Sequence, residues 1–74
     1  MGRLANLTYR QVIKKLKRLG FRFYRQAAGR DKLWHHPEKN IFTTIPNHPG
    51  NIPEGKVRAI VKQAQVAIDD FLQA

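Results

Sequence analysis

The chain has 74 residues, 42% of them hydrophobic, which is enough for one small core and indicates a single domain over residues 1–74. It has no cysteine, which excludes a disulfide framework and a cysteine-ligated zinc site. Residues 1–6 lack the apolar run of a signal peptide, and no later stretch is long and apolar enough to span a membrane. We therefore expect a cytoplasmic protein without a membrane partner, in which residues 1–6 are poorly ordered.

Positive charge is concentrated in the first half of the chain. The sequence has 14 Lys and Arg against 5 Asp and Glu, a net charge of +9. Residues 1–32 hold ten of the basic side chains and one acidic side chain, Asp31, whereas residues 33–74 hold four of each kind. A field of one sign on so small a body attracts polyanions such as RNA. Charge alone leaves open the alternative of a solvated face that only keeps the protein soluble.

Residues 9–19 have the pattern of an amphipathic helix. Thr8 and Gln11 stand at the spacing of a capping box, in which each side chain bonds a backbone N–H at the start of the helix. Gly20 can take the left-handed conformation that ends a helix. The apolar positions that recur with helical period, and so predict a buried face, are Tyr9, Val12, Ile13, Leu16 and Leu19.

Three short strands are expected next, over residues 21–26, 31–36 and 41–45, because these segments are rich in aromatic and β-branched residues. The turns between them are short, which favours an antiparallel meander. Most of the aromatic side chains, including Phe21, Phe23 and Trp34, are expected in the core. Tyr24 is the expected exception, available to stack on unpaired bases.

The last third of the chain is expected to be helical after a loop over residues 46–55 that is rich in Pro, Gly and Asn. An apolar stripe then recurs with helical period. It leaves open whether residues 53–73 form one helix or two with a break near Gln65. In the second case, Asp69 and Asp70 would lie in the first turn of a short third helix.

These elements predict an α+β fold with the order α-β-β-β-α and a possible short C-terminal third helix. A three-stranded antiparallel sheet would pack one face on two helices and leave the other face partly exposed. This is the element order of double-stranded-RNA-binding domains. Order alone does not establish function.

Over residues 7–72 the sequence resembles the HicA family of bacterial toxins. Each matching segment is short, but the segments occur in the family's order and near its spacing. The segments that carry the resemblance are Leu7-Thr8, Val12-Ile13-Lys14, Leu16, Leu19-Gly20-Phe21, Trp34, His36-Pro37, Thr44-Ile45-Pro46-Asn47-His48-Pro49-Gly50, Ile52-Pro53, Gly55, Val57-Arg58, Ile60, Lys62-Gln63-Ala64 and Asp70-Phe71-Leu72.

The resemblance implies an mRNA-cleaving endoribonuclease that is neutralised by a HicB antitoxin bound over its active site. In the family, the active histidine follows a glycine and usually a serine at the turn into the second strand. Here Gly29 is followed by Arg30 and Asp31, so Asp31 occupies the histidine position, and a register shifted by one residue places Lys32 there. Histidine can accept or donate a proton near neutral pH, whereas an ionised carboxylate cannot protonate a leaving oxygen. The group that performs the chemistry is therefore unknown from the sequence.

Two other histidines, His35 and His48, are weak candidates to replace the missing one. His35 and His36 are adjacent on a predicted strand, so they point to opposite faces and cannot chelate a metal together. We expect no metal and no small-molecule cofactor. His48 matches a histidine of the family's loop, where a contact with RNA and a role in anchoring the loop both remain open.

We expect RNA to be bound mainly through its phosphates. The residues expected to contact RNA are Lys14, Lys17, Arg18, Arg22, Arg25, Arg30, Lys32 and His48. Three functions remain open: a toxin that cleaves mRNA with a rearranged site, an RNA-binding module that has lost cleavage, and a module whose basic face binds an acidic antitoxin. Antitoxin and RNA would compete for the same surface.

Overall fold

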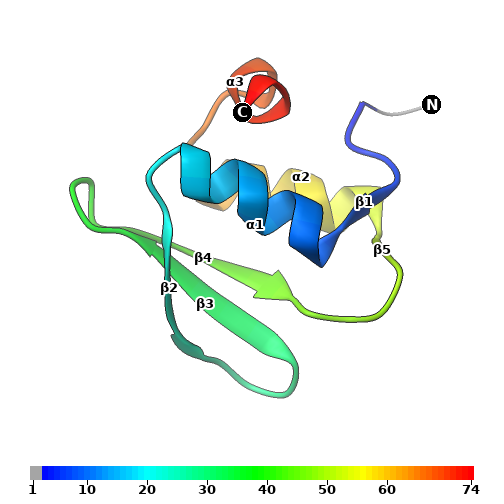
Figure 1. The fold of residues 1–74 in the computed structure, drawn as a ribbon, viewed down its shortest axis with the longest axis horizontal. Coiled ribbons are helices and arrows are strands. Elements are labelled where there is room, and N and C mark those ends of the chain that lie inside the picture. Colours follow the sequence, from blue (N-terminus) through cyan, green and yellow to red (C-terminus); the bar gives the residue numbers. More distant parts are fainter. Residues whose placement is uncertain (1–2) are drawn as a thin grey trace.

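The structure is a computed structural model that describes residues 3–74, in which the helices lie on one side of a three-stranded sheet (Figure 1). The elements in chain order are β1 (Leu7–Thr8), α1 (Tyr9–Arg18), β2 (Arg22–Gln26), β3 (Asp31–His36), β4 (Ile41–Pro46), β5 (Asn51–Ile52), α2 (Glu54–Gln63) and α3 (Ile68–Gln73). This is the expected α+β arrangement, consistent with a double-stranded-RNA-binding domain. Within residues 3–74, no helix has the length and apolar character needed to cross a bilayer.

Helix α1 begins as the sequence predicts. Thr8 Oγ1 accepts a hydrogen bond from the Gln11 N–H at 3.2 Å, and the Gln11 side chain accepts one from the Thr8 N–H at 2.9 Å, which completes the capping box. Val12 and Leu16 are fully buried on the predicted face. The helix ends one residue earlier than expected, because its last residue is Arg18 and the chain turns at Gly20, whose φ is 102°.

Strands β2, β3 and β4 pair in that order as the predicted antiparallel meander. On β3, Trp34 and His36 are buried on the side of the helices, whereas Leu33 and His35 alternate with them and lie on the opposite side, called here the outer face. The expectation of one packed face and one partly exposed face is confirmed. All residues of β2, an edge strand of the sheet, are exposed.

Two helices, rather than one, occupy the C-terminal segment. The break falls at the expected place, where Gln65 takes a left-handed conformation with φ 58°. Gln63 fixes the end of α2 to β4, because its Oε1 accepts hydrogen bonds from the Thr43 hydroxyl at 3.1 Å and the Thr44 N–H at 3.3 Å. Asp69 and Asp70 lie in the first turn of α3, as predicted.

Lys15 joins α1 to the end of α3. Its Nζ donates to the carbonyl oxygen of Leu72 at 2.9 Å and to that of Ala74 at 3.4 Å, and it lies 5.9 Å from the centre of the Phe71 ring. A lysine at the carboxyl end of a helix satisfies carbonyl groups that have no partner within the helix. Lys15 is thus a structural lysine and not part of the surface expected to bind RNA.

The core includes one residue that the sequence analysis placed in a poorly ordered segment. Leu4 is fully buried, and residues 3–6 form turns that lead into β1. The expectation of poor order also covered residues 1–2, which lie outside the described residues. Pairing of Leu7 with Ile52 and of Thr8 with Asn51 fixes the start of the chain to β5, a strand that the sequence analysis treated as loop.

The division of the aromatic side chains between the core and the surface differs in part from the prediction. Phe21 and Trp34 are buried, as expected, and Tyr24 is 53% exposed, as expected. Phe23, expected in the core, is 54% exposed, and Phe42 is 40% exposed. Strand period alone could not separate these cases, because Phe23 lies on an edge strand that is exposed throughout, and Phe42 pairs with His35 on the outer face.

Candidate nucleic-acid interface

The turn that joins β2 to β3 is held by the side chain of Gln26. Its Nε2 donates to the carbonyl oxygen of Gly29 at 2.7 Å and to that of Asp31 at 3.1 Å. Lys32 Nζ donates in turn to Gln26 Oε1. Gly29 has φ 60°, a left-handed conformation that glycine adopts without strain. The bonds of Gln26 therefore give the turn a defined shape and hold the Lys32 side chain beside it.

The 47–50 loop lies against this turn, because the Asn47 N–H donates to the Arg30 carbonyl oxygen at 3.2 Å. Between the two segments is a shallow depression, called here the basic hollow, to which Arg30, Lys32 and His48 all contribute. Its lining residues are Gln26, Gly29, Arg30, Lys32, Asn47, His48 and Pro49. None of these is acidic, so the hollow presents positive charge that no carboxylate in it offsets.

His48 also borders a second depression at the start of α1, lined by Thr8, Tyr9, Arg10, Ile13, Asn47, His48 and Gly50. His48 thus lies between the basic turn and the first turn of the helix. Arg10 is not among the residues that the sequence predicts to bind RNA. The signal for it was present, because Arg10, Lys14 and Lys17 recur at the i, i+4, i+7 spacing of one helix face.

At the other end of α1, Lys17 lies against the sheet. Its Nζ is 5.7 Å from the centre of the Trp34 ring, and it lines a depression with Arg22, Phe23 and Trp34. Arg18 and Lys14 are exposed on α1. The basic side chains of α1 therefore form a stripe from the depression beside His48 to the start of β2.

Asp31 and His35 do not lie in the basic hollow. Asp31 lines a different depression, between β4 and α2, together with Thr44, Pro46, Gly55, Lys56, Ala59, Ile60 and Gln63. His35 lies on the outer face of the sheet, where its Nε2 makes a 2.9 Å hydrogen bond with Asn40 Oδ1. Of the three positions considered for chemistry, the structure brings His48 alone together with Arg30 and Lys32.

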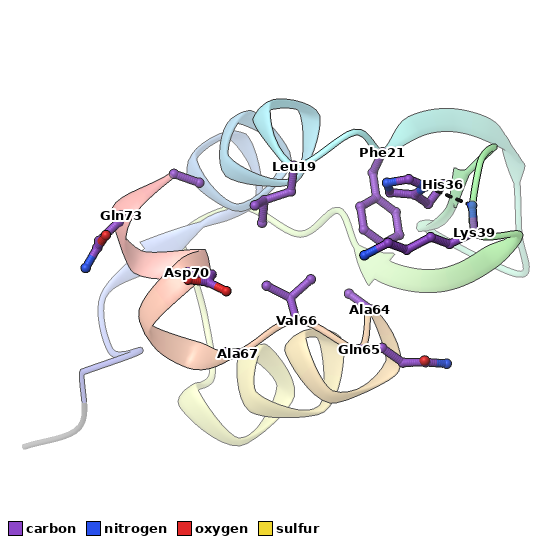
Figure 2. A pocket seen from close by; sticks show the side chains of 11 residues that line it. Leu19, Phe21, His36, Lys39, Ala64, Gln65, Val66, Ala67, Asp70 and Gln73 are labelled. Atoms are coloured by element: carbon purple, nitrogen blue, oxygen red, sulfur yellow. Dashed lines mark hydrogen bonds between the residues drawn. The ribbon is translucent and has the colours of Figure 1, made fainter.

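His36 has a structural place on the other side of β3. Its Nδ1 accepts a hydrogen bond from the Lys39 N–H at 3.2 Å, and its ring meets Phe21 edge-on at 5.2 Å. Figure 2 shows these residues beside the apolar Leu19 and Val66 in a pocket between the end of α1 and the C-terminal helices. A Cβ added at Gly20 would lie 2.6 Å from His36 Nε2, so the buried ring rests directly on the backbone of the turn after α1. These contacts explain a histidine here without any chemical role.

Within residues 3–74, no three His, Cys, Asp or Glu side chains form a group that could hold a metal ion. Asp69 forms an ion pair with Arg3, and Glu54 forms one with Arg58.

A comparison with known protein families matches residues 9–66 to the model described as the HicA toxin of bacterial toxin–antitoxin systems. The match covers well over half of the chain, from the start of α1 to the residue after the break at Gln65. The chain belongs to the HicA toxin family. A search of curated proteins gave no significant match. Family membership confirms the resemblance seen in the sequence and makes this HicA-family chain a toxin component of a toxin–antitoxin system.

Proposed function

We propose that this HicA-family chain is an mRNA-cleaving toxin that binds RNA over α1, the turn between β2 and β3, and the 47–50 loop. The observation that carries the proposal is the convergence of Arg30, Lys32 and His48 on one hollow without an acidic lining residue. Cationic side chains on a concave surface attract the phosphate backbone and give an affinity that depends strongly on salt. The stripe of Arg10, Lys14, Lys17 and Arg18 extends this positive surface along α1.

The chemistry assigned to the basic hollow follows from its residue types. Cleavage of RNA through the ribose 2′-hydroxyl requires a group that accepts the hydroxyl proton and a group that protonates the leaving oxygen. His48 is the imidazole in the hollow, and imidazole exchanges protons near neutral pH. Arg30 and Lys32 would stabilise the negative charge that develops on the phosphate oxygens. Asp31 is assigned no step, because its side chain lines another depression.

A HicB-like antitoxin is proposed as the protein partner. An antitoxin that presents acidic side chains to the basic hollow would exclude RNA from it, so antitoxin and RNA would compete for one surface. The proposal therefore predicts that RNA and antitoxin cannot bind the same molecule together.

A second function is supported by the sequence Arg30-Asp31-Lys32, which stands where the resemblance implies the family's active histidine. In this alternative, the chain keeps the fold and the positive surface but binds RNA or antitoxin without cleaving RNA. It differs from the first function in the chemical step alone, so a cleavage assay decides between them.

The test compares RNA cleavage by the natural protein, His48→Ala and Asp31→Ala. We expect His48→Ala to lower the cleavage rate by about 10²–10⁴-fold, the usual contribution of a positioned acid or base. Asp31→Ala is expected to leave the rate unchanged. Loss of cleavage in Asp31→Ala with retention in His48→Ala would refute the assignment. Binding of RNA without any cleavage by the natural protein would establish the alternative.

A further inference from the structure

Three ring side chains form a cluster on the outer face of the sheet, one from each strand. Tyr24 comes from β2, His35 from β3 and Phe42 from β4, and they are called here the aromatic cluster. The rings of His35 and Phe42 are stacked, with centres 4.3 Å apart and planes 23° apart. Tyr24 meets both edge-on, at 5.5 Å from His35 and 5.1 Å from Phe42. The cluster therefore forms a continuous row across the strands.

Much of this row is open to solvent, although its members are large. Tyr24 is 53% exposed and Phe42 is 40% exposed. The helices pack on the opposite side of the sheet (Figure 1). Trp34, Thr43 and Ile45 are the buried strand residues on that side. Exposed apolar rings that are clustered, rather than scattered singly, indicate a binding surface for a ligand or a macromolecule.

The bulge in β2 brings positive charge to the same place. The pairing register shifts between Phe23 and Arg25, so Arg25 pairs with Leu33 instead of facing the helices. Leu33 shares its face with His35, and directly paired residues share a face, so Arg25 lies on the outer face. Arg22 pairs directly with His35 and also lies there. The aromatic cluster is thus bordered by two arginines.

No carboxylate in the described part of the chain neutralises these arginines. The two ion pairs within residues 3–74 involve Arg3 and Arg58. A partner for this face must therefore supply both flat, apolar surface for the rings and negative charge for the guanidinium groups. Unpaired nucleotides supply both, since bases stack on aromatic rings and phosphates bind arginine.

We propose that the outer face of the sheet is a stacking platform for unpaired RNA bases, with Tyr24 and Phe42 as the stacking residues and Arg22 and Arg25 as phosphate contacts. His35 acts as a positioning residue, held by Asn40 and stacked on Phe42. This inference rests on the proposed RNA-binding function and goes beyond it. It assigns a second contact surface, on the side of the sheet away from the helices, and a preference for single-stranded over duplex RNA.

The test measures the affinity of the full chain for a short oligouridylate and for a blunt RNA duplex of equal length. The test variant is Tyr24→Leu/Phe42→Leu, which keeps apolar side chains but removes the rings. It is expected to lose roughly 5- to 100-fold in oligouridylate affinity per lost stack. Its affinity for the duplex should stay unchanged, and the salt dependence should keep its slope, because no phosphate contact is removed.

Two controls separate ring stacking from general damage to the sheet. Tyr24→Phe/Phe42→Tyr retains both rings and is expected to keep the natural affinity. Phe23→Leu removes an equally exposed ring that packs edge-on against Trp34 instead of joining the cluster, and it is expected to have little effect.

An equal loss of affinity for single strand and duplex, or no loss for either, would overturn the platform while leaving RNA binding intact. Loss of self-association or of antitoxin binding in the double leucine variant, without loss of RNA affinity, would also overturn it and make this face a protein-docking surface. Failure of the natural protein to bind either RNA at low salt would instead refute the proposed function itself.

Discussion

Asp31 and Lys32 are neighbours in the sequence, but their side chains line different depressions. Lys32 and His48 both line the basic hollow, whereas Asp31 and Lys56 both line the depression between β4 and α2. The sequence resemblance implies that the family's active histidine corresponds to Asp31, or to Lys32 if the register shifts by one residue. A histidine at position 32 would enter the hollow where the phosphate is proposed to bind.

We therefore expect Lys32→His to raise the RNA cleavage rate more than Asp31→His. The new imidazole would give the hollow a second proton-exchanging group beside His48, a change worth about 10²–10⁴-fold when the group is well placed. Rates at saturating RNA separate this gain from the weaker binding caused by loss of a lysine. A larger gain from Asp31→His would show that the side chain at position 31 faces the RNA.

Gly20 has a left-handed φ of 102°, and its Cα faces the buried ring of His36 so closely that an added Cβ would clash with it. Gly20→Ala should lower the free energy of unfolding by about 2 kcal/mol or more. The strained backbone costs roughly 1–2 kcal/mol, and the clash of the added Cβ with His36 comes on top of it. Gly29→Ala is the matched control, with φ 60° but no heavy atom within 4 Å of an added Cβ. Equal losses of unfolding free energy in denaturant would mean that the His36 contact is unimportant.

At the scale of elements, α1 links the core to the proposed RNA surface. Thr8→Ala should lower the free energy of unfolding by about 1 kcal/mol, because the capping hydrogen bond is lost. Leu16→Ala should cost about 2–5 kcal/mol, because it leaves a cavity beneath the helix. Denaturant unfolding measures both. Equal small effects at the two positions would contradict the assignment of the buried face.

Helix periodicity, the capping box and the β-branched segments predicted these elements because each signal is local. The pairing of β1 with β5 and the burial of Leu4 depend on contacts between distant parts of the chain, so no local pattern contains them. The bulge that turns Arg25 outward is likewise set by pairing with β3. The sequence predicted Arg30, Lys32 and His48 as binding residues, but their shared hollow required the packing of the 47–50 loop on the β2–β3 turn.

At the scale of the whole molecule, the distribution of charge follows the distribution of elements. Residues 1–32, which carry the whole net charge, supply α1, β2 and the turn into β3. Helices α2 and α3 together hold three basic and three acidic residues, so their charges cancel, and Glu54 and Asp69 form ion pairs. Positive potential therefore gathers on the side formed by α1, β2 and the basic hollow. Such a distribution favours fast, salt-sensitive association with a polyanion.

The most direct test of this account is the affinity of the full chain for RNA measured across a range of salt concentrations. We expect a log–log slope of several units, reduced by about two in Arg30→Gln/Lys32→Gln, since each phosphate contact contributes roughly one unit. The matched control Lys56→Gln/Lys62→Gln removes equal charge from exposed positions on α2 and should keep the natural slope. A flat salt dependence, or equal reductions in the two double variants, would contradict RNA binding at the basic hollow.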